Sequence, residues 1–180
     1  MLFRVYLQQL FDGVPGDVYL LLLAVFCISA MVLLSFRGAR SGGRGVLVVL
    51  LAEYVFLLYC STIIFRGEAE RGHNFLPFWS YVEIYNGDEQ GLLPQNIMNV
   101  LVFVPIGLLL GAAFRSMNWW KAGVIGCAVS VLIEILQYVF KRGFSEFDDV
   151  FHNVMGCMIG YAISVVLAKY LKVRLLSNIE

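Results

Sequence analysis

Six polar side chains lie at the edges of long apolar runs or inside them: Asn96, Asn99, Glu134, Gln137, Asp149 and Asn153. Polar groups are costly in hydrocarbon, so a cluster of them within a membrane is a candidate functional site. Carboxylates and amides together can bind a polar group, and a carboxylate pair such as Glu134 and Asp149 can do acid–base chemistry if burial raises one pKa. Whether these side chains meet depends on the elements that carry them.

The composition places the chain among membrane proteins. Of its 180 residues, 60% are hydrophobic and 14% are charged, whereas a soluble domain is about half apolar and a quarter charged. We therefore predict an all-α, polytopic helical bundle that forms a single membrane domain over residues 1–180. The net charge is zero and no long basic tract is present, which argues against a nucleic-acid partner.

Five apolar runs are long enough to cross a bilayer, which takes roughly 20 residues per helix. They cover residues 18–36, 46–65, 96–114, 119–140 and 150–171. A shorter apolar stretch at 75–85 cannot span and is predicted to be interfacial or re-entrant. Residues 1–17 could lie on the membrane surface.

Basic residues in the connecting segments predict the orientation. With the N-terminus outside and the C-terminus inside, eight basic residues lie inside: Arg37, Arg40, Arg44, Arg115, Lys121, Lys169, Lys172 and Arg174. Five lie outside: Arg4, Arg66, Arg71, Lys141 and Arg142. Because cytoplasmic loops carry the excess of Lys and Arg, this orientation in the bacterial cytoplasmic membrane is favoured.

The run at 96–114 carries a polar face at its outer end. Asn96 and Asn99 are three residues apart, which puts them on one side of a helix. Phe103, Gly107 and Gly111 continue that side towards the interior of the membrane.

The run at 119–140 carries a second stripe. Ser130, Glu134, Gln137 and Lys141 follow offsets of 0, 4, 7 and 11, which place them on one helical face. Glu134 lies six residues from the outer end, roughly 9 Å deep at 1.5 Å per residue. A carboxylate at that depth must pair with another group or take up a proton.

The run at 150–171 repeats the pattern with Asp149, Asn153, Gly156, Gly160 and Ser164. Its small residues allow another helix to approach closely. Three stripes therefore converge near the outer surface, where Arg66, Arg71 and Arg142 share the same side. The prediction is a charged pocket that opens outward between the last three spans, with arginines able to contact phosphate.

Purely structural roles remain open for these residues. The amides of Asn96, Asn99, Gln137 and Asn153 could only join helices through hydrogen bonds. Asp148 and Asp149 could instead interact favourably with the dipole at the start of the last helix.

The sequence predicts neither a metal site nor a cofactor. His73 and His152 are the only histidines, and Asp148 and His152 share a helical face. Zinc sites need three or four ligands of suitable geometry, and no HExxH or GxSxG motif is present.

Four separated segments resemble the VanZ-like family of bacterial membrane proteins. They are RGHNFLPF at 71–78, NVLVFVPIG at 99–107, SVLIEILQ at 130–137, and the segment from Arg142 through Asp148-Asp149 to Asn153, Gly156 and Gly160. They correspond to the family patterns R…NLIPF, NxxxFxPxG, SxxxExxQ and R…DD…NxxGxxxG, in that order. The resemblance covers about residues 62–165. Glu146 stands where the family pattern has Asp.

The resemblance implies a role in resistance to the glycopeptide teicoplanin or in cell-envelope physiology. From the depth and spacing of the polar stripes, we expect the pocket to bind a lipid headgroup or a lipid-linked cell-wall precursor, and the antibiotic itself is a further candidate partner. The predicted ligand-binding residues are Arg66, Arg71, Asn74, Asn99, Glu134, Gln137, Arg142, Asp148, Asp149 and Asn153. One alternative is an enzyme that modifies an envelope lipid, with Glu134 or Asp149 as acid or base. Two others are a small transporter and a purely structural bundle. The oligomeric state stays open.

Overall fold

The computed structural model describes residues 42–67, 72–87 and 91–177 of the chain. The predicted span at 18–36, the predicted surface segment at 1–17 and Arg71 lie outside the described residues.

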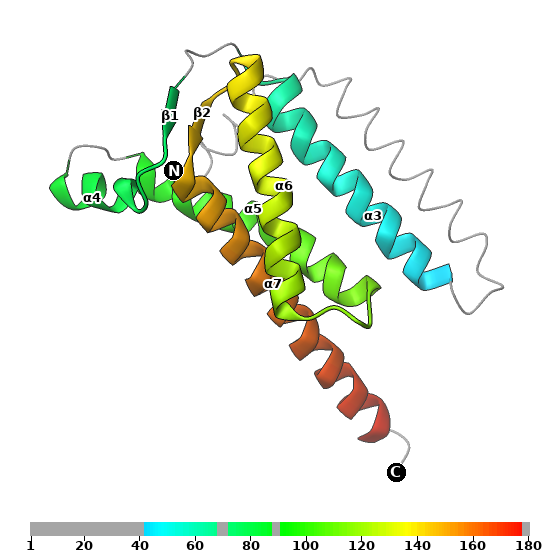
Figure 1. Cartoon of the computed structure of the whole chain (residues 1–180). Helices are drawn as coiled ribbons and strands as arrows, with labels where there is room; N and C mark the ends of the chain where they lie inside the picture. Colours follow the sequence, from blue (N-terminus) through cyan, green and yellow to red (C-terminus); the bar gives the residue numbers. More distant parts are fainter. Residues whose placement is uncertain (1–41, 68–71, 88–90, 178–180) are drawn as a thin grey trace.

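Among the described residues, four helices are long and apolar enough to cross a membrane. They are α3 (Gly42–Tyr59), which runs into the π-helical turn η1 (Cys60–Ile64), α5 (Leu92–Ala113), α6 (Trp119–Phe140) and α7 (Phe147–Ser177). They coincide with the predicted second to fifth spans within a few residues, because a long apolar run fixes helix length more firmly than helix ends. The predicted all-α membrane bundle is thereby confirmed, with its helices side by side in Figure 1.

Local signals set the ends of α6. The side chain of Asn118 accepts a hydrogen bond from the Lys121 N–H at 2.9 Å, which caps the first turn. The helix stops at Lys141, whose φ of 54° is left-handed, and the chain then turns into strand β2 (Phe144–Glu146). The turn directs the polar end of α6 towards the start of α7.

One end of the bundle carries additional short elements. Strand β1 (Gly72–Asn74) pairs in parallel with β2, with Gly72 opposite Phe144 and Asn74 opposite Glu146. The short helix α4 (Trp79–Asn86) follows β1 and projects sideways from the bundle (Figure 1). Helix α4 occupies the stretch that was predicted to be interfacial or re-entrant. The two strands were not predicted, because three residues are too few to show a strand period in the sequence.

The closest helix pair is α5 with α7, and glycines make the approach possible. A Cβ built on Gly156 would lie 2.0 Å from the carbonyl oxygen of Val100, and one on Gly160 would lie 2.0 Å from that of Val104. Gly107 meets the carbonyl oxygen of Cys157 in the same way. The predicted packing role of Gly156 and Gly160 is therefore confirmed.

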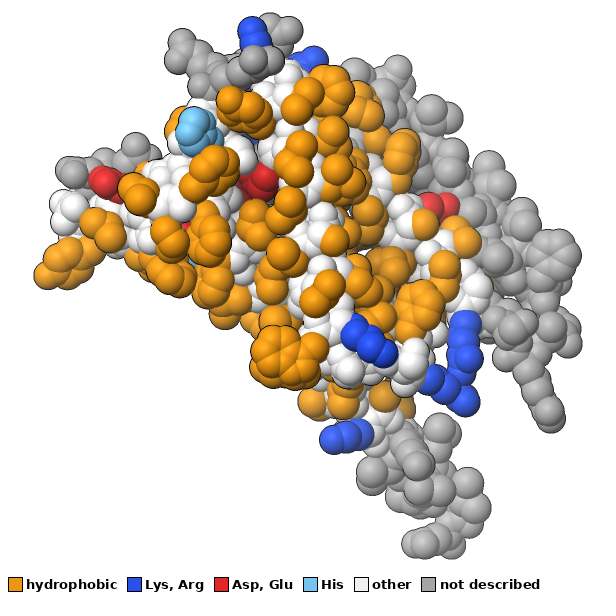
Figure 2. All heavy atoms as spheres, viewed as in Figure 1, with side chains coloured by type: hydrophobic (Ala, Val, Ile, Leu, Met, Phe, Trp, Pro, Cys, Tyr) orange, Lys and Arg blue, Asp and Glu red, His pale blue; other side chains and the backbone are white. Residues whose placement is uncertain are grey.

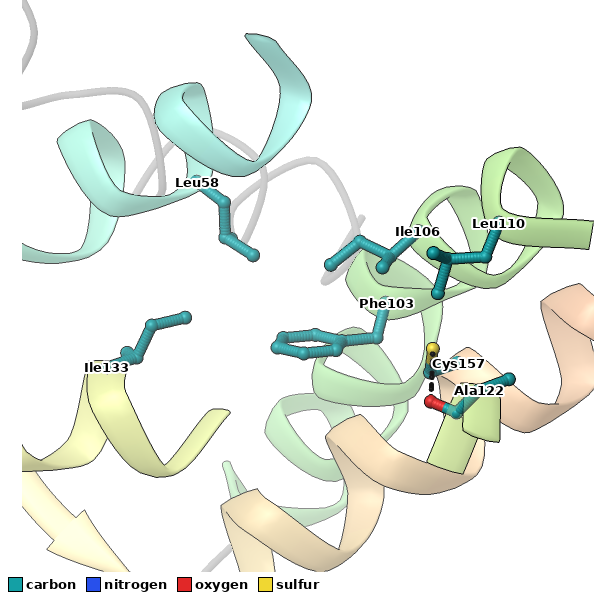
Figure 3. Close-up of a cluster of buried hydrophobic side chains, with 7 residues drawn as sticks. All are labelled: Leu58, Phe103, Ile106, Leu110, Ala122, Ile133 and Cys157. Carbon is teal, nitrogen blue, oxygen red and sulfur yellow. Dashed lines mark hydrogen bonds between the residues drawn. The ribbon is translucent and has the colours of Figure 1, made fainter. Parts of the chain in front are cut away.

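A small buried core joins all four helices: Leu58, Phe103, Ile106, Leu110, Ala122, Ile133 and Cys157. Figure 3 shows Leu58, Phe103 and Ile133 pointing towards a shared space from three different helices. Apolar side chains cover much of the outer surface in Figure 2, as expected where lipid tails and not water surround the helices.

Candidate functional site

A cavity of about 490 Å³ opens within the bundle at the end that carries β2. Its polar lining comes from five elements or their flanks: Ser61, Thr62, Arg66, Gln95, Asn99, Glu134, Gln137, Glu146 and Asp149. Its apolar wall includes Leu58, Phe103 and Ile133, the same side chains that face one another in Figure 3. The core thus closes the inner side of the cavity, and the polar stripes line the rest.

Three carboxylates share this cavity. Glu134 is only 6% exposed, and its Oε2 accepts a hydrogen bond from the backbone N–H of Glu146 at 3.1 Å. Asp149 accepts a hydrogen bond from Asn99 Nδ2 at 2.6 Å, and Gln95 lines the same cavity. These contacts fix the first turn of α7 against α5, and the end of β2 against α6.

Glu146 is the third carboxylate, and it lies just outside the spans. Burial raises its pKa to about 7, and the nearby charges of Asp149 and Asp148 add to that increase. The Trp79 indole lies beside its carboxylate, but the indole nitrogen is buried without a well-formed hydrogen bond. Glu146 can therefore change its protonation state near neutral pH.

Arg66 brings the opposite charge to the cavity. It follows η1 in an exposed position and lies close enough to interact electrostatically with Glu134, Glu146 and Asp149. Its guanidinium rests against Gly143, where a Cβ would lie 3.0 Å from Arg66 Nη1. A side chain at position 143 would therefore push the guanidinium aside.

Arg142 does not line the cavity. Its Nη1 donates to the backbone carbonyl of Arg66 at 2.7 Å. Arg142 thus holds the segment that presents Arg66, while its own charge stays away from the cavity floor.

Asp148 is fully buried and caps helix α4. Its Oδ1 accepts from the Phe78 N–H at 2.6 Å, and its Oδ2 accepts from the Ser80 N–H at 3.0 Å and the Ser80 hydroxyl at 2.6 Å. Asn96 Nδ2 donates to the same hydroxyl at 3.0 Å. Asp148 and Asn96 therefore join α4 to α5 and α7, outside the cavity.

Two other predicted residues also make local or interhelical bonds away from the cavity. Asn153 Nδ2 donates to Ser130 Oγ at 2.8 Å, which links α7 to α6. Asn74 Oδ1 accepts from the Leu76 N–H at 3.1 Å within its own turn. Of the nine predicted ligand-binding residues that the structure describes, five line the cavity: Arg66, Asn99, Glu134, Gln137 and Asp149.

Comparison with known proteins identifies the family. A family model described as VanZ/LLP1 matches residues 45–168, well over half of the chain. The chain belongs to the VanZ-like family. Protein VanZ of Enterococcus faecium is 24% identical over 134 residues, which cover 72% of this chain and 83% of that relative. No solved structure matches the chain.

The VanZ-like match contains the whole cavity, since the lining runs from Leu58 to Asp149. It also contains the four segments that carried the resemblance in the sequence. The chain is thus a VanZ-like membrane protein, and three of its four family segments contribute to the lining of the cavity.

The cavity includes residues that the sequence did not single out. Glu146 lies in a connection with no helical period, and its only signal was its place where the VanZ-like pattern has Asp. Gln95 precedes the predicted third span by one residue. Ser61 and Thr62 belong to the predicted second span, so the cavity extends beyond the last three spans, contrary to the prediction.

The histidines of this VanZ-like protein lie apart from the cavity lining. His152 Nε2 shares a hydrogen bond with the Tyr81 hydroxyl at 2.7 Å, and His73 stacks on Phe75. Across the described residues, no group of three His, Cys, Asp or Glu side chains could hold a metal ion.

Proposed function

We propose that this protein binds the polar headgroup of an envelope lipid, or of a lipid-linked cell-wall precursor, in its cavity at the outer face of the bacterial cytoplasmic membrane. By doing so it would contribute to glycopeptide (teicoplanin) resistance or to cell-envelope physiology. The observation that carries the proposal is the convergence of Arg66, Asn99, Glu134, Gln137 and Asp149 on one cavity.

The size and lining of the cavity suit a headgroup. Ligand sites in proteins usually measure about 300–1,000 Å³ and combine apolar walls with a few placed polar groups. A cavity of about 490 Å³ with Phe65, Met98 and Val102 beside its polar residues fits that description. The apolar outer surface would let the acyl chains of the same lipid remain in the bilayer.

The distribution of basic residues supports an outward-facing cavity. Arg44 starts α3, Arg115 and Lys121 flank the connection from α5 to α6, and Lys169 lies late in α7. All four belong to the end opposite the cavity, against three described at the cavity end, Arg66, Lys141 and Arg142, and Figure 2 shows Lys and Arg side chains at both ends. Because basic residues favour the cytoplasmic side, the cavity end would lie outside.

The orientation can be tested with cysteine variants in intact cells. Lys141→Cys, at the cavity end, should react with a membrane-impermeant maleimide, whereas Arg115→Cys should react only after the cells are opened. The reverse pattern would contradict the outward-facing cavity. The unmodified chain sets the background from its own cysteines.

The central experiment fills the cavity. Ser61 lines it, and within the described part of the chain its hydroxyl donates only to the Leu58 carbonyl one turn earlier, so Ser61→Trp adds bulk at little other cost. Ala128→Trp adds the same side chain at an exposed position of α6. In a susceptible bacterium that expresses the chain, Ser61→Trp should abolish any gain in the inhibitory concentration of teicoplanin, and Ala128→Trp should preserve it. Equal resistance from both variants, at equal protein levels, would refute the proposal.

The similarity to VanZ supports the choice of teicoplanin as the first antibiotic to test, because the family is associated with resistance to it. Should teicoplanin susceptibility stay unchanged by the wild-type chain, the same pair of variants can be compared by lipid binding in detergent.

The presence of three carboxylates in one cavity favours a second candidate, a membrane enzyme that modifies an envelope lipid. Glu134 and Asp149 would act as acid and base. Lipid mass spectrometry of cells with and without the chain separates the two functions. A lipid that appears with the wild type and disappears with Glu134→Gln supports the enzyme, while an unchanged lipidome supports binding alone.

A further inference from the structure

The described lining of the cavity carries unequal charge. Three carboxylates, Glu134, Glu146 and Asp149, face a single guanidinium, Arg66. Carboxylates that share a poorly solvated site repel one another, and each needs a proton or a cation nearby. A site with this balance is a poor host for a ligand that carries only negative charge.

The carboxylates also have hydrogen-bond acceptors to spare. Glu134 is 6% exposed, and among the described residues only the Glu146 N–H donates to it, at Oε2. Glu146 is 8% exposed, and the Trp79 indole beside it forms no well-aligned hydrogen bond. A carboxylate accepts about four hydrogen bonds. These two buried side chains therefore keep free hydrogen-bond acceptor sites that a ligand in the cavity could use.

Amide groups complete the arrangement. Asn99 donates to Asp149 Oδ1 and Gln137 donates to the Thr62 carbonyl at 3.3 Å, so both amides are already held in place. Arg66, in contrast, follows the last turn of η1 in an exposed position and rests against Gly143. The positive charge of Arg66 therefore lies at the exposed side of the cavity, and the three carboxylates lie inside it.

We infer that the cavity selects a headgroup with a primary ammonium close to a phosphate, in which the ammonium lies among Glu134, Glu146 and Asp149 and the phosphate contacts Arg66. This inference rests on the proposed function, because it specifies the ligand of the same cavity. A primary ammonium brings one positive charge and three N–H donors, which match the three carboxylates. Guanidinium pairs well with phosphate oxygens.

Two envelope sources carry both a primary ammonium and phosphate, and only the first has the two groups close together. An aminophospholipid has its ammonium two carbons from the phosphate, whereas a polyprenyl-linked cell-wall precursor has a peptide amine and a pyrophosphate farther apart. Both are amphiphiles of the outer leaflet, so the probes must include each.

The test measures binding to the purified full-length chain in detergent by native mass spectrometry. The probes are phosphatidylethanolamine, phosphatidylglycerol and phosphatidylcholine with identical short acyl chains, and a polyprenyl-pyrophosphate-linked muropeptide. We expect phosphatidylethanolamine to bind at least about tenfold more tightly than phosphatidylglycerol, the effect of one charge-assisted hydrogen bond. Phosphatidylcholine, whose methylated ammonium cannot donate N–H bonds, should bind more weakly than phosphatidylethanolamine. If the muropeptide outcompetes phosphatidylethanolamine and both depend on Glu146, the precursor is the source of the ammonium.

Single substitutions separate the two charges of the ligand. Glu146→Gln should reduce the preference for phosphatidylethanolamine over phosphatidylglycerol, and Glu83→Gln, a matched change on α4 outside the cavity lining, should leave it intact. Arg66→Gln should weaken both lipids by a similar factor, because both carry phosphate. Glu146→Gln keeps the backbone N–H that bonds Glu134, so the variant retains that structural contact.

Failure of this inference is distinguishable from failure of the proposed function. Equal binding of phosphatidylethanolamine and phosphatidylglycerol to the wild type would overturn ammonium selection. If Ser61→Trp then still abolishes binding of both lipids, the proposed headgroup binding is supported and only the preference for an ammonium is refuted. If Ser61→Trp changes neither affinity, the proposed function fails as well.

Discussion

The contact of α5 with α7 positions the cavity, and Gly156→Ala tests how closely it is fitted. The added Cβ would lie 2.0 Å from the Val100 carbonyl oxygen, whereas ordinary contact begins at 3.4 Å. Because the obstacle is helix backbone, no side-chain rotation can relieve it. The two helices must move apart locally by about 1.4 Å, the difference between these distances.

The expected cost follows from two opposing effects. Alanine is the better helix former by up to about 1 kcal/mol relative to glycine. Overpacking of a fitted contact typically costs 1–3 kcal/mol, and separation of the helices also removes dispersion contacts along the interface. The net change should be a loss of about 1–2 kcal/mol, with Asp149 and Asn99 also drawn apart, because they join the same helix pair.

Gly123→Ala is the matched control. It is the same substitution in a buried position of α6, but its Cβ would lie 3.2 Å from the Met158 sulfur, the end of a flexible side chain. Thermal unfolding in detergent can be monitored by fluorescence-detected size-exclusion chromatography. Relative to the wild type, the midpoint temperature should be lower for Gly156→Ala and nearly unchanged for Gly123→Ala. If Gly156→Ala is as stable as Gly123→Ala, the inference of close backbone contact is refuted.

Three further predictions address the cavity end. Asp148→Ala removes the acceptor of three hydrogen bonds from Phe78 and Ser80 and should speed hydrogen–deuterium exchange across α4, while unchanged exchange would show that α4 does not need this cap. The raised pKa of Glu146, about 7 against 4.5 unfolded, means that the folded state holds the proton more tightly; the free energy of unfolding should therefore fall as pH rises from 4.5 to 7, by up to about 1.4 kcal/mol per pH unit. Glu146→Gln should flatten that slope, and a persistent slope would assign it to other groups. Gly143→Ala should displace the Arg66 guanidinium and weaken binding of a phosphate-bearing lipid without loss of thermal stability, since only a flexible side chain has to move.

The spans and their inward faces could be predicted because both depend on periodicity within one helix. Ser130, Glu134 and Gln137 are all buried on α6, as their offsets of 4 and 3 require. A run of about 20 apolar residues likewise fixes the length of each span. Neither prediction needed knowledge of a distant part of the chain.

The partner of each polar side chain could not be predicted in the same way. Asn96 and Asn99 share a helical face, yet Asn96 donates to Ser80 on α4 and Asn99 donates to Asp149 in the cavity. The difference depends on where α4 docks, and α4 is held by Asp148 from the other end of the sequence. A helical stripe identifies the direction of a side chain but not what another element places there.

The sequence also does not distinguish between two arginines in the segments that connect the helices. Arg66 and Arg142 both follow a span and both lie at the cavity end, so charge and position alone make them equivalent phosphate ligands. The structure separates them because Arg142 donates to the Arg66 carbonyl, while Arg66 lines the cavity. Glu146 was missed for the complementary reason, since its burial comes from its place at the end of β2, next to α6 and α7.

Some residues of the family segments hold elements together and others line the cavity, so substitutions at the two kinds of position should be interpreted differently. Asp148, Asn153, Gly156 and Gly160 hold elements together, so their loss would act mainly through stability. Glu134, together with Gln137 and Asp149, lines the cavity, where a conservative amide or carboxylate exchange changes charge more than packing. A phenotype at Asp148 therefore says little about the ligand, whereas a phenotype at Glu134 or Glu146 with unchanged thermal stability argues directly for a bound group. Adjacent residues such as Asp148 and Asp149 thus require different controls, because one caps α4 and the other lines the cavity.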